Sequence, residues 1–219
     1  MNIILGVISI ILTFSSVVLM EKLFKKEGLY VWVSIATILA NIIVCKTVTV
    51  LGLTSSLGNI MFASNFLATD ILSEKYGKED AKKAITIALV STIIFIVTTQ
   101  ISLLYIPDTT DIAQESMKTL FGLNLRTSIA SLSMFYISNL FDIYLFDKLR
   151  QKYPKKLWLR NNVATIISNS AENYLFATIA FLGIFDIPTI ISIATTGTII
   201  EIVIALLDTP FIYLSKKLR

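Results

Sequence analysis

Five carboxylates interrupt stretches of the chain that are otherwise apolar: Asp70, Asp142, Glu172, Glu201 and Asp208. A charged side chain near the centre of a bilayer costs at least ~2.5 kcal/mol, so it normally faces a protein interior, a cavity or a partner charge. Glu172 and Glu201 are predicted near mid-membrane, where a functional role is the better explanation. The three aspartates are predicted nearer one end of their stretches, where a structural ion pair and a substrate role both remain open.

Amides, hydroxyls and aromatic rings share helical faces with these acids. At 100° per residue, Glu172 falls beside Asn169 and Asn173, with Phe176 between the two polar stripes of the same stretch. The other stripes hold Asn65, Phe66 and Asp70; Phe135, Asn139 and Asp142; and Glu201 with Asp208. Serine, threonine and alanine on these faces are better explained as contacts between helices. Carboxylates, amides and rings together suit a flat, polar heterocycle, which stacks on rings and donates N–H groups to oxygens.

The elements that hold these residues are membrane helices. Of 219 residues, 55% are hydrophobic and 16% charged, and the mean hydropathy is +0.76, which is too apolar for a soluble domain. We expect an all-α, polytopic integral membrane helical bundle, with residues 1–219 forming a single transmembrane domain. Candidate spans cover residues 2–20, 30–50, 55–73, 84–106, 127–147, 162–182 and 189–211. The third and sixth are the least apolar, so six or seven transmembrane helices are expected.

The absence of certain residue types limits the chemistry. The chain has no histidine and a single cysteine, Cys45, so a histidine or thiolate metal cluster and Ser/His or Cys/His catalysis are disfavoured. We expect no enzymatic activity, no metal, no cofactor and no nucleic-acid partner.

Basic residues indicate the orientation. With seven spans, all but three of the 19 Lys and Arg residues lie at one side of the membrane, which the positive-inside rule assigns to the cytoplasm. The N-terminus is then outside and the C-terminus cytoplasmic. The basic loops are interpreted as topology signals alone, and residues 107–125 as an external loop with an amphipathic turn.

Several sequence runs match a known family. Phe66-Leu-Ala-Thr-Asp70 with Ser73-Glu-Lys-Tyr-Gly77, the run from Asp142 to Arg150, and the run from Trp158 to Thr165 with Ser168 resemble the queuosine precursor transporters, also called the vitamin uptake transporter family. The resemblance implies a bacterial inner-membrane importer of 7-deazaguanine bases such as preQ0, preQ1 or queuine. For such an importer we expect alternating access. The chain departs from the family where Glu172 and Asn173 replace an Asp-Thr pair.

By motif, the resemblance carries over to Asp70, Asp142, Asn161, Asn162, Thr165 and Ser168. The chemistry of the polar faces suggests roles for other residues. Glu172 would accept the ring N–H and exocyclic amine of the base, and Asn169 and Asn173 would bind its carbonyl and ring nitrogens. Phe176 or Phe135 would stack on it. The full set of expected substrate-binding residues is Glu172, Asn169, Asn173, Asn65, Asp70, Asn139, Asp142, Glu201, Phe66, Phe135 and Phe176. Glu172 or Glu201 would carry protons if transport is proton-coupled.

Two other functions remain as alternatives. The chain could be the substrate-binding subunit of an energy-coupling-factor vitamin transporter. Such a subunit depends on separate ATPase partners, and this sequence has no Walker-type phosphate loop of its own. The first span lacks the Ala-x-x-x-Ala pattern that such subunits use for docking. A membrane-embedded aspartyl hydrolase is disfavoured because its signature motifs are missing. A homodimer is left open.

Overall fold

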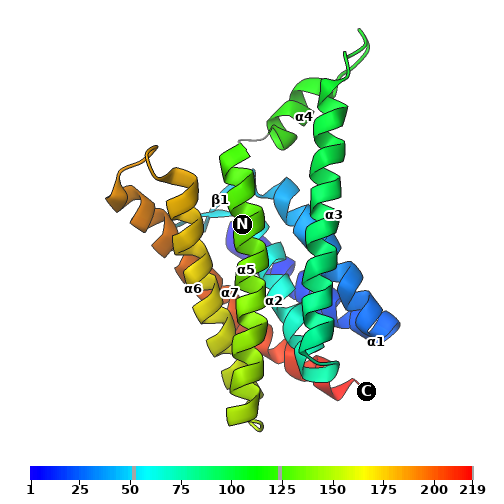
Figure 1. Ribbon diagram of the computed structural model, residues 1–219, viewed down its shortest axis with the longest axis vertical. Coiled ribbons are helices and arrows are strands. Elements are labelled where there is room, and N and C mark those ends of the chain that lie inside the picture. The colour runs from blue at the N-terminus through cyan, green and yellow to red at the C-terminus, as the bar shows by residue number, and fades with distance from the viewer. Residues whose placement is uncertain (51–52, 123–124, 219) are drawn as a thin grey trace.

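The computed structural model describes residues 1–50, 53–122 and 125–218, with the backbone alone at 50, 53–55 and 125–129. Helices α1 (Asn2–Ile43), α2 (Gly58–Lys75), α3 (Lys78–Leu104), α4 (Gln114–Phe121), α5 (Leu125–Lys152), α6 (Leu157–Phe181) and α7 (Ile187–Lys217) form a bundle beside a hairpin of β1 (Thr47–Val50) and β2 (Leu53–Ser56) (Figure 1). The predicted all-α class is confirmed. By length and composition α1, α3 and α7 can each cross a membrane, and the count of six or seven crossings stays a prediction.

The first two predicted spans lie in α1, which is bent sharply at Lys25 (φ 54°, ψ −137°). The chain folds back there and brings its two ends together, so that the Asn2 side chain donates a hydrogen bond to the carbonyl of Thr49 at 3.1 Å. Gly28 permits this reversal. A Cβ atom at Gly28 would lie 2.2 Å from the carbonyl oxygen of Met20, so a larger residue would push the two halves of α1 apart.

The second span is shorter than predicted. Helix α1 ends at Ile43, and the residues expected to continue it form an antiparallel hairpin in which Thr47 pairs with Ser56. The sequence Thr-Val-Thr-Val of β1 explains the difference, since β-branched residues favour strands. The third helix accordingly begins at Gly58 and not at residue 55.

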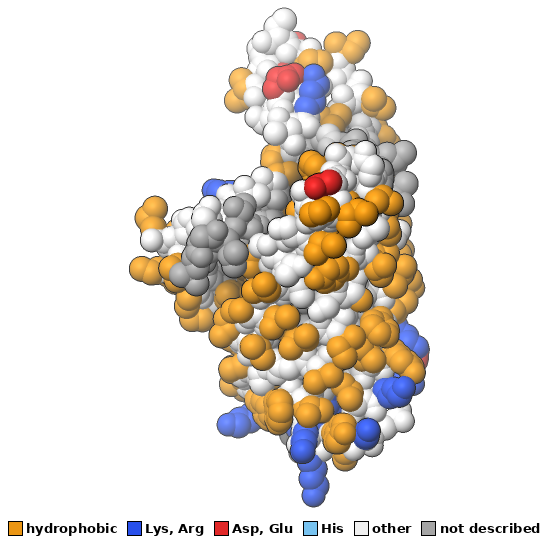
Figure 2. Space-filling model, turned by 90° about the vertical axis from the view of Figure 1, so that its left-hand side faces the viewer, with side chains coloured by type: hydrophobic (Ala, Val, Ile, Leu, Met, Phe, Trp, Pro, Cys, Tyr) orange, Lys and Arg blue, Asp and Glu red, His pale blue; other side chains and the backbone are white. Residues whose placement is uncertain are grey.

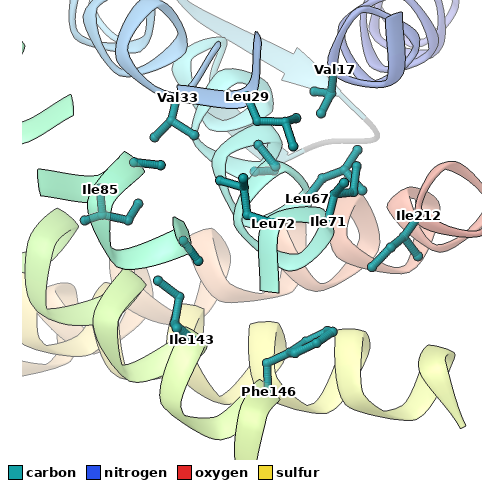
Figure 3. Packing of buried hydrophobic residues seen from close by; sticks show 14 of the residues in the cluster. Val17, Leu29, Val33, Leu67, Ile71, Leu72, Ile85, Ile143, Phe146 and Ile212 are labelled. Atoms are coloured by element: carbon teal, nitrogen blue, oxygen red, sulfur yellow. The ribbon is translucent and has the colours of Figure 1, made fainter. Parts of the chain in front are cut away.

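Helix α2 lies at the centre of the bundle. Its residues 63–73 are all buried, and it packs against α1, α3, α5 and α7. Leu67, Ile71 and Leu72 meet Val17, Leu29 and Val33 of α1, Ile85 of α3, Ile143 and Phe146 of α5, and Ile212 of α7 (Figure 3). A helix surrounded by protein on all sides needs no apolar face toward lipid. This position explains why the α2 region is among the least apolar candidate spans.

The outer surface is that of a membrane protein. Exposed hydrophobic side chains cover α1, α3, α6 and α7, and Figure 2 shows them as a broad band above a lower end where Lys and Arg gather. The C-terminus, the α2–α3 turn and the α5–α6 turn lie at that end (Figure 1). We call it the basic end.

The segment between α3 and α5 contains the amphipathic turn predicted there, as helix α4. The Asp111 carboxylate accepts hydrogen bonds from the backbone N–H groups of Ala113 and Gln114, at 2.6 and 3.1 Å, where α4 begins. In the preceding turn, the Thr110 hydroxyl and backbone N–H donate to Asp108. These hydrogen bonds hold the pKa of the Asp108 carboxyl below its usual value. The segment is therefore ordered by its own polar groups.

Candidate functional site

A polar cavity of about 150 Å³ lies between five helices. Its lining residues are Asn41 of α1 and Val44 just after that helix; Asn59, Phe62, Ala63 and Phe66 of α2; Ser131, Phe135 and Asn139 of α5; Asn169, Glu172, Asn173 and Phe176 of α6; and Glu201 of α7. Most residues predicted to bind substrate are therefore brought together. Asn65, Asp70 and Asp142 are not in the lining. Asn65 instead donates to the Thr37 hydroxyl at 3.1 Å and joins α2 to α1.

Each cavity glutamate is held by one neighbouring donor. The Ser138 hydroxyl donates to Glu172 Oε2 at 2.6 Å. The Asn173 amide donates to Glu201 Oε2 at 2.6 Å and to the carbonyl of Asn169 at 3.0 Å. Through these bonds the carboxylates of α6 and α7 are fixed on neighbouring walls of one cavity.

Amide oxygens add further acceptors. The Asn139 Nδ2 group donates to the carbonyl of Phe135 at 2.8 Å, one turn back along α5. The Oδ1 atoms of Asn139 and Asn169 are buried and have no hydrogen-bond partner among the described residues. Buried acceptors are normally satisfied, so these walls favour a bound molecule that carries N–H donors.

Aromatic rings complete the cavity. Phe66 and Phe135 are buried, and Phe176 is half-buried and packs edge-on against Phe181, with 6.1 Å between ring centroids. Among the described residues that line the cavity there is no Lys or Arg. The arrangement suits a small, flat molecule with several donors, and it offers no cation for a phosphate.

Sequence reasoning missed three features of this site. Asn41 of α1 lies in the lining. The sequence feature that could have identified it is an amide one turn after Thr37 in an apolar stretch. Gly197 of α7 lets the Asn173 side chain approach, since a Cβ atom there would lie 2.7 Å from Asn173 Oδ1. A second, apolar cavity of about 490 Å³ lies between α1, the hairpin and α7, and shares Asn59 with the polar one.

Asp70, Asp142 and Asp208 are buried away from the cavity lining. A structural ion pair with the basic loops was left open for them, and that interpretation is wrong. Among the residues that the structure describes, no Lys or Arg side chain forms an ion pair with any of the three. Asp208 is bound instead by the Asn161 amide at 2.6 Å.

The basic residues do more than set topology, so that part of the interpretation is also wrong. Glu74 of α2 accepts hydrogen bonds from Arg160 of α6 and, at 2.9 Å, from Lys216 of α7. Arg160 is 1% exposed, and its Nη1 group donates to the carbonyl of Pro154 at 2.6 Å. This pair joins two of the sequence runs that carry the family resemblance.

A second network at the basic end holds α1 against α2 and α7. Lys75 donates to Glu21 Oε1 at 2.5 Å and to the carbonyl of Ser215 at 2.8 Å. Tyr76 lies beside the same carboxylate, and burial together with Glu21 raises the pKa of its hydroxyl to about 12. The basic end is thus closed by ion pairs that connect four of the helices.

Comparisons with known proteins identify the family of the chain. A family model described as "Putative vitamin uptake transporter" matches residues 56–215. A Bacillus subtilis protein named as a probable queuosine precursor transporter is 37% identical over 210 residues, covering 95% of this chain and 92% of that protein. A Haemophilus influenzae protein of the same name is 30% identical over 58% of this chain and 52% of its own length.

An Escherichia coli queuosine precursor transporter is 25% identical over 68% of this chain and 67% of its own length. No solved structure matches the chain. The family match spans α2 to α7, which includes all but the α1 part of the cavity wall. The chain therefore belongs to the vitamin uptake transporter family.

Proposed function

We propose that this protein imports a queuosine precursor, a free 7-deazaguanine base such as preQ0, preQ1 or queuine, across the bacterial inner membrane. The observation that carries the proposal is the polar cavity, where two glutamates, five asparagines and four phenylalanines converge from five helices. The names of the relatives, above all the Bacillus subtilis protein, point to the same class of substrate.

The cavity chemistry matches such a base. A 7-deazaguanine presents a ring N–H and an exocyclic amine along one edge, and it lacks the N7 acceptor of guanine. Donors are therefore a larger share of its polar groups, and they are matched by acceptors of the protein. Glu172 takes the ring N–H and the amine, and Asn169 and Asn173 bind the carbonyl and ring nitrogens. Phe135 or Phe176 stacks on the ring face. A cavity of about 150 Å³ is on the scale that holds an aromatic ring and is too small for a nucleotide.

Import proceeds by alternating access in a chain that crosses the membrane seven times, with the N-terminus outside and the basic end in the cytoplasm. The positive-inside rule supports this orientation, because Lys and Arg gather at one end (Figure 2). The ion pairs around Glu74 and Glu21 hold that end shut in the conformation described above. Release of substrate to the cytoplasm then requires these contacts to rearrange.

The test is uptake by the purified chain alone in liposomes. Radiolabelled preQ1 and queuine should enter saturably, without ATP, and unlabelled precursor should compete better than guanine or guanosine. Empty liposomes are the control. Precursor that binds but enters only when ATPase subunits are added would show instead a substrate-binding subunit of an energy-coupling-factor transporter. No binding and no uptake would contradict the proposal.

A substitution at Gly197 tests the cavity without removing a polar group. In Gly197→Ala the new methyl group would displace the Asn173 amide, which we expect to raise the KM for precursor uptake roughly threefold to tenfold, as for the loss of about one hydrogen bond. Gly6→Ala is the matched control, because nothing lies within 4 Å of a Cβ there. An unchanged KM in Gly197→Ala would place Asn173 outside the binding site.

A further inference from the structure

Three buried aspartates lie beneath the polar cavity, toward the basic end. Asp70 follows the cavity residue Phe66 by four positions, and Asp142 follows Asn139 by three. Asp208 comes two turns after Glu201 on α7. With 3.6 residues per turn, the acids of α2, α5 and α7 lie one to two turns below the cavity lining. They form a separate cluster, which we call the aspartate cluster.

The groups around the cluster are oxygens. The Asp142 carboxyl faces Asp70 and, from α6, the hydroxyls of Thr165 and Ser168. Asp208 lies within electrostatic reach of Asp70 and accepts a hydrogen bond from Asn161. Thr165 Oγ1, Ser168 Oγ and both carboxyl oxygens of Asp70 and Asp142 are buried without a hydrogen-bond partner among the described residues. Asp70, Asp142, Thr165 and Ser168 are each at most 1% exposed.

The guanidinium of Arg160 near the cluster is largely engaged by other groups, although its buried Nε has no hydrogen-bond partner among the described residues. Arg160 of α6 is within electrostatic reach of Asp70, but its Nη2 group pairs with Glu74 and its Nη1 group with backbone carbonyls. A buried carboxylate needs a proton, a paired charge or a bound cation. Two facing carboxylates tend to share one proton, and carboxylate and hydroxyl oxygens are ligands for a hard cation.

We propose that Asp70 and Asp142, with the Thr165 and Ser168 hydroxyls, form a site for one monovalent cation, Na⁺ or a proton, and that Asp208 acts on this site through its charge. The described residues contain no group of three or more acidic side chains arranged to hold a metal ion, so Asp208 is left out of the ligand set. The inference deepens the proposed transport function and rests on it. It moves ion coupling away from Glu172 and Glu201, which are then left to the substrate.

The position of the site allows it to be coupled to the cavity. Helices α2, α5 and α6 each carry a cavity residue within one turn of a cluster residue: Phe66 and Asp70, Asn139 and Asp142, Asn169 and Thr165. A cation that favours one arrangement of these helices therefore changes the affinity of the cavity for its base. By linkage, the base changes the cation affinity by the same factor.

The experiment compares gradients in liposomes that contain the purified full chain. Accumulation of labelled preQ1 is measured with an inward Na⁺ gradient, with an inward proton gradient and with neither, beside counterflow exchange, which needs no gradient. Wild type should accumulate base under one of the two gradients. Asp142→Asn should take up base equally with and without it. Asp147→Asn is the matched control, on the same helix but on the surface and paired with Lys78, and should behave as wild type.

Two results would overturn the inference: wild type that exchanges base but accumulates it under neither gradient, and Asp142→Asn that accumulates as wild type does. Absence of counterflow in wild type would contradict the transport function instead. The site is then judged by thermal unfolding in Na⁺ or choline and at several pH values. A cation-dependent shift that Asp142→Asn lacks supports the site, and an identical response of the two proteins overturns it.

A milder variant covers the case in which Asp142→Asn does not fold. Thr165→Val combined with Ser168→Ala removes two hydroxyls and leaves the carboxylates in place. We expect the cation concentration for half-maximal accumulation to rise about tenfold, or roughly 1.4 kcal/mol in binding free energy. An unchanged concentration dependence would show that these hydroxyls do not contact the ion.

Discussion

Glu172→Gln is expected to weaken precursor binding roughly tenfold to a hundredfold. Glu172 is fixed at the cavity wall by the Ser138 hydroxyl at 2.6 Å, and it is assigned to the donor edge of the base. A hydrogen bond to a charged group contributes about 1.5–3 kcal/mol. A glutamine would place an N–H donor opposite the donors of the base, so the loss falls mainly on substrate affinity. The measurement is the Kd of purified protein for preQ1, together with the KM for uptake.

Glu115→Gln is the control for this variant. Glu115 lies in α4, is 87% exposed and pairs only with Lys118 three residues on, so its loss should change neither Kd nor KM. If Glu172→Gln binds and imports base as well as wild type does, the carboxylate is not a substrate ligand. The assignment of the cavity would then be wrong.

Of the variants proposed here, Glu74→Gln is expected to lower the free energy of unfolding most. Glu74 joins Arg160 and Lys216, and the side chain of Arg160 is 1% exposed while that of Glu74 is 11% exposed. Removing one partner of a buried ion pair leaves the other charge unpaired, which typically costs about 3–5 kcal/mol. Thermal and denaturant unfolding of the purified protein in detergent would measure this loss.

The exposed ion pair between Lys78 and Asp147 provides the comparison. Its side chains are 49% and 24% exposed, and such pairs contribute at most about 1 kcal/mol. Lys78→Met should therefore change the unfolding midpoint far less than Glu74→Gln. Equal midpoints for the two variants would show that the Glu74 network does not hold the basic end together.

Helical periodicity predicted which faces are polar but not how deep each residue lies. Glu172, Asn169 and Phe135 were placed on polar stripes from sequence and do line one cavity. Asp70 and Asp142 share stripes with cavity residues and were expected in the same site. They lie outside the lining, and a projection along the helix axis could not show this because it gives no position along the axis. Depth is set by the packing of α2 against its neighbours.

Hydropathy failed where local backbone preference or packing decided the outcome. Residues 47–50 are apolar enough to extend a span, yet their β-branched side chains form a strand. Gly197 could have been noticed, since glycine in a helix costs about 1 kcal/mol relative to alanine. Its reason lies on another helix, in the Asn173 side chain, and no pattern within α7 shows it.

The central position of α2 bears on how the chain enters the membrane during synthesis. Its buried surface includes Asn65, Asp70 and Ser73, so this helix alone would partition poorly into lipid. Its neighbours come from both directions along the chain, from α1 before it and from α3, α5 and α7 after it. In a ribosome-bound chain truncated just after α2, we therefore expect that helix to stay at the translocon. In the full chain, its release into the bilayer would wait for the synthesis of the later helices.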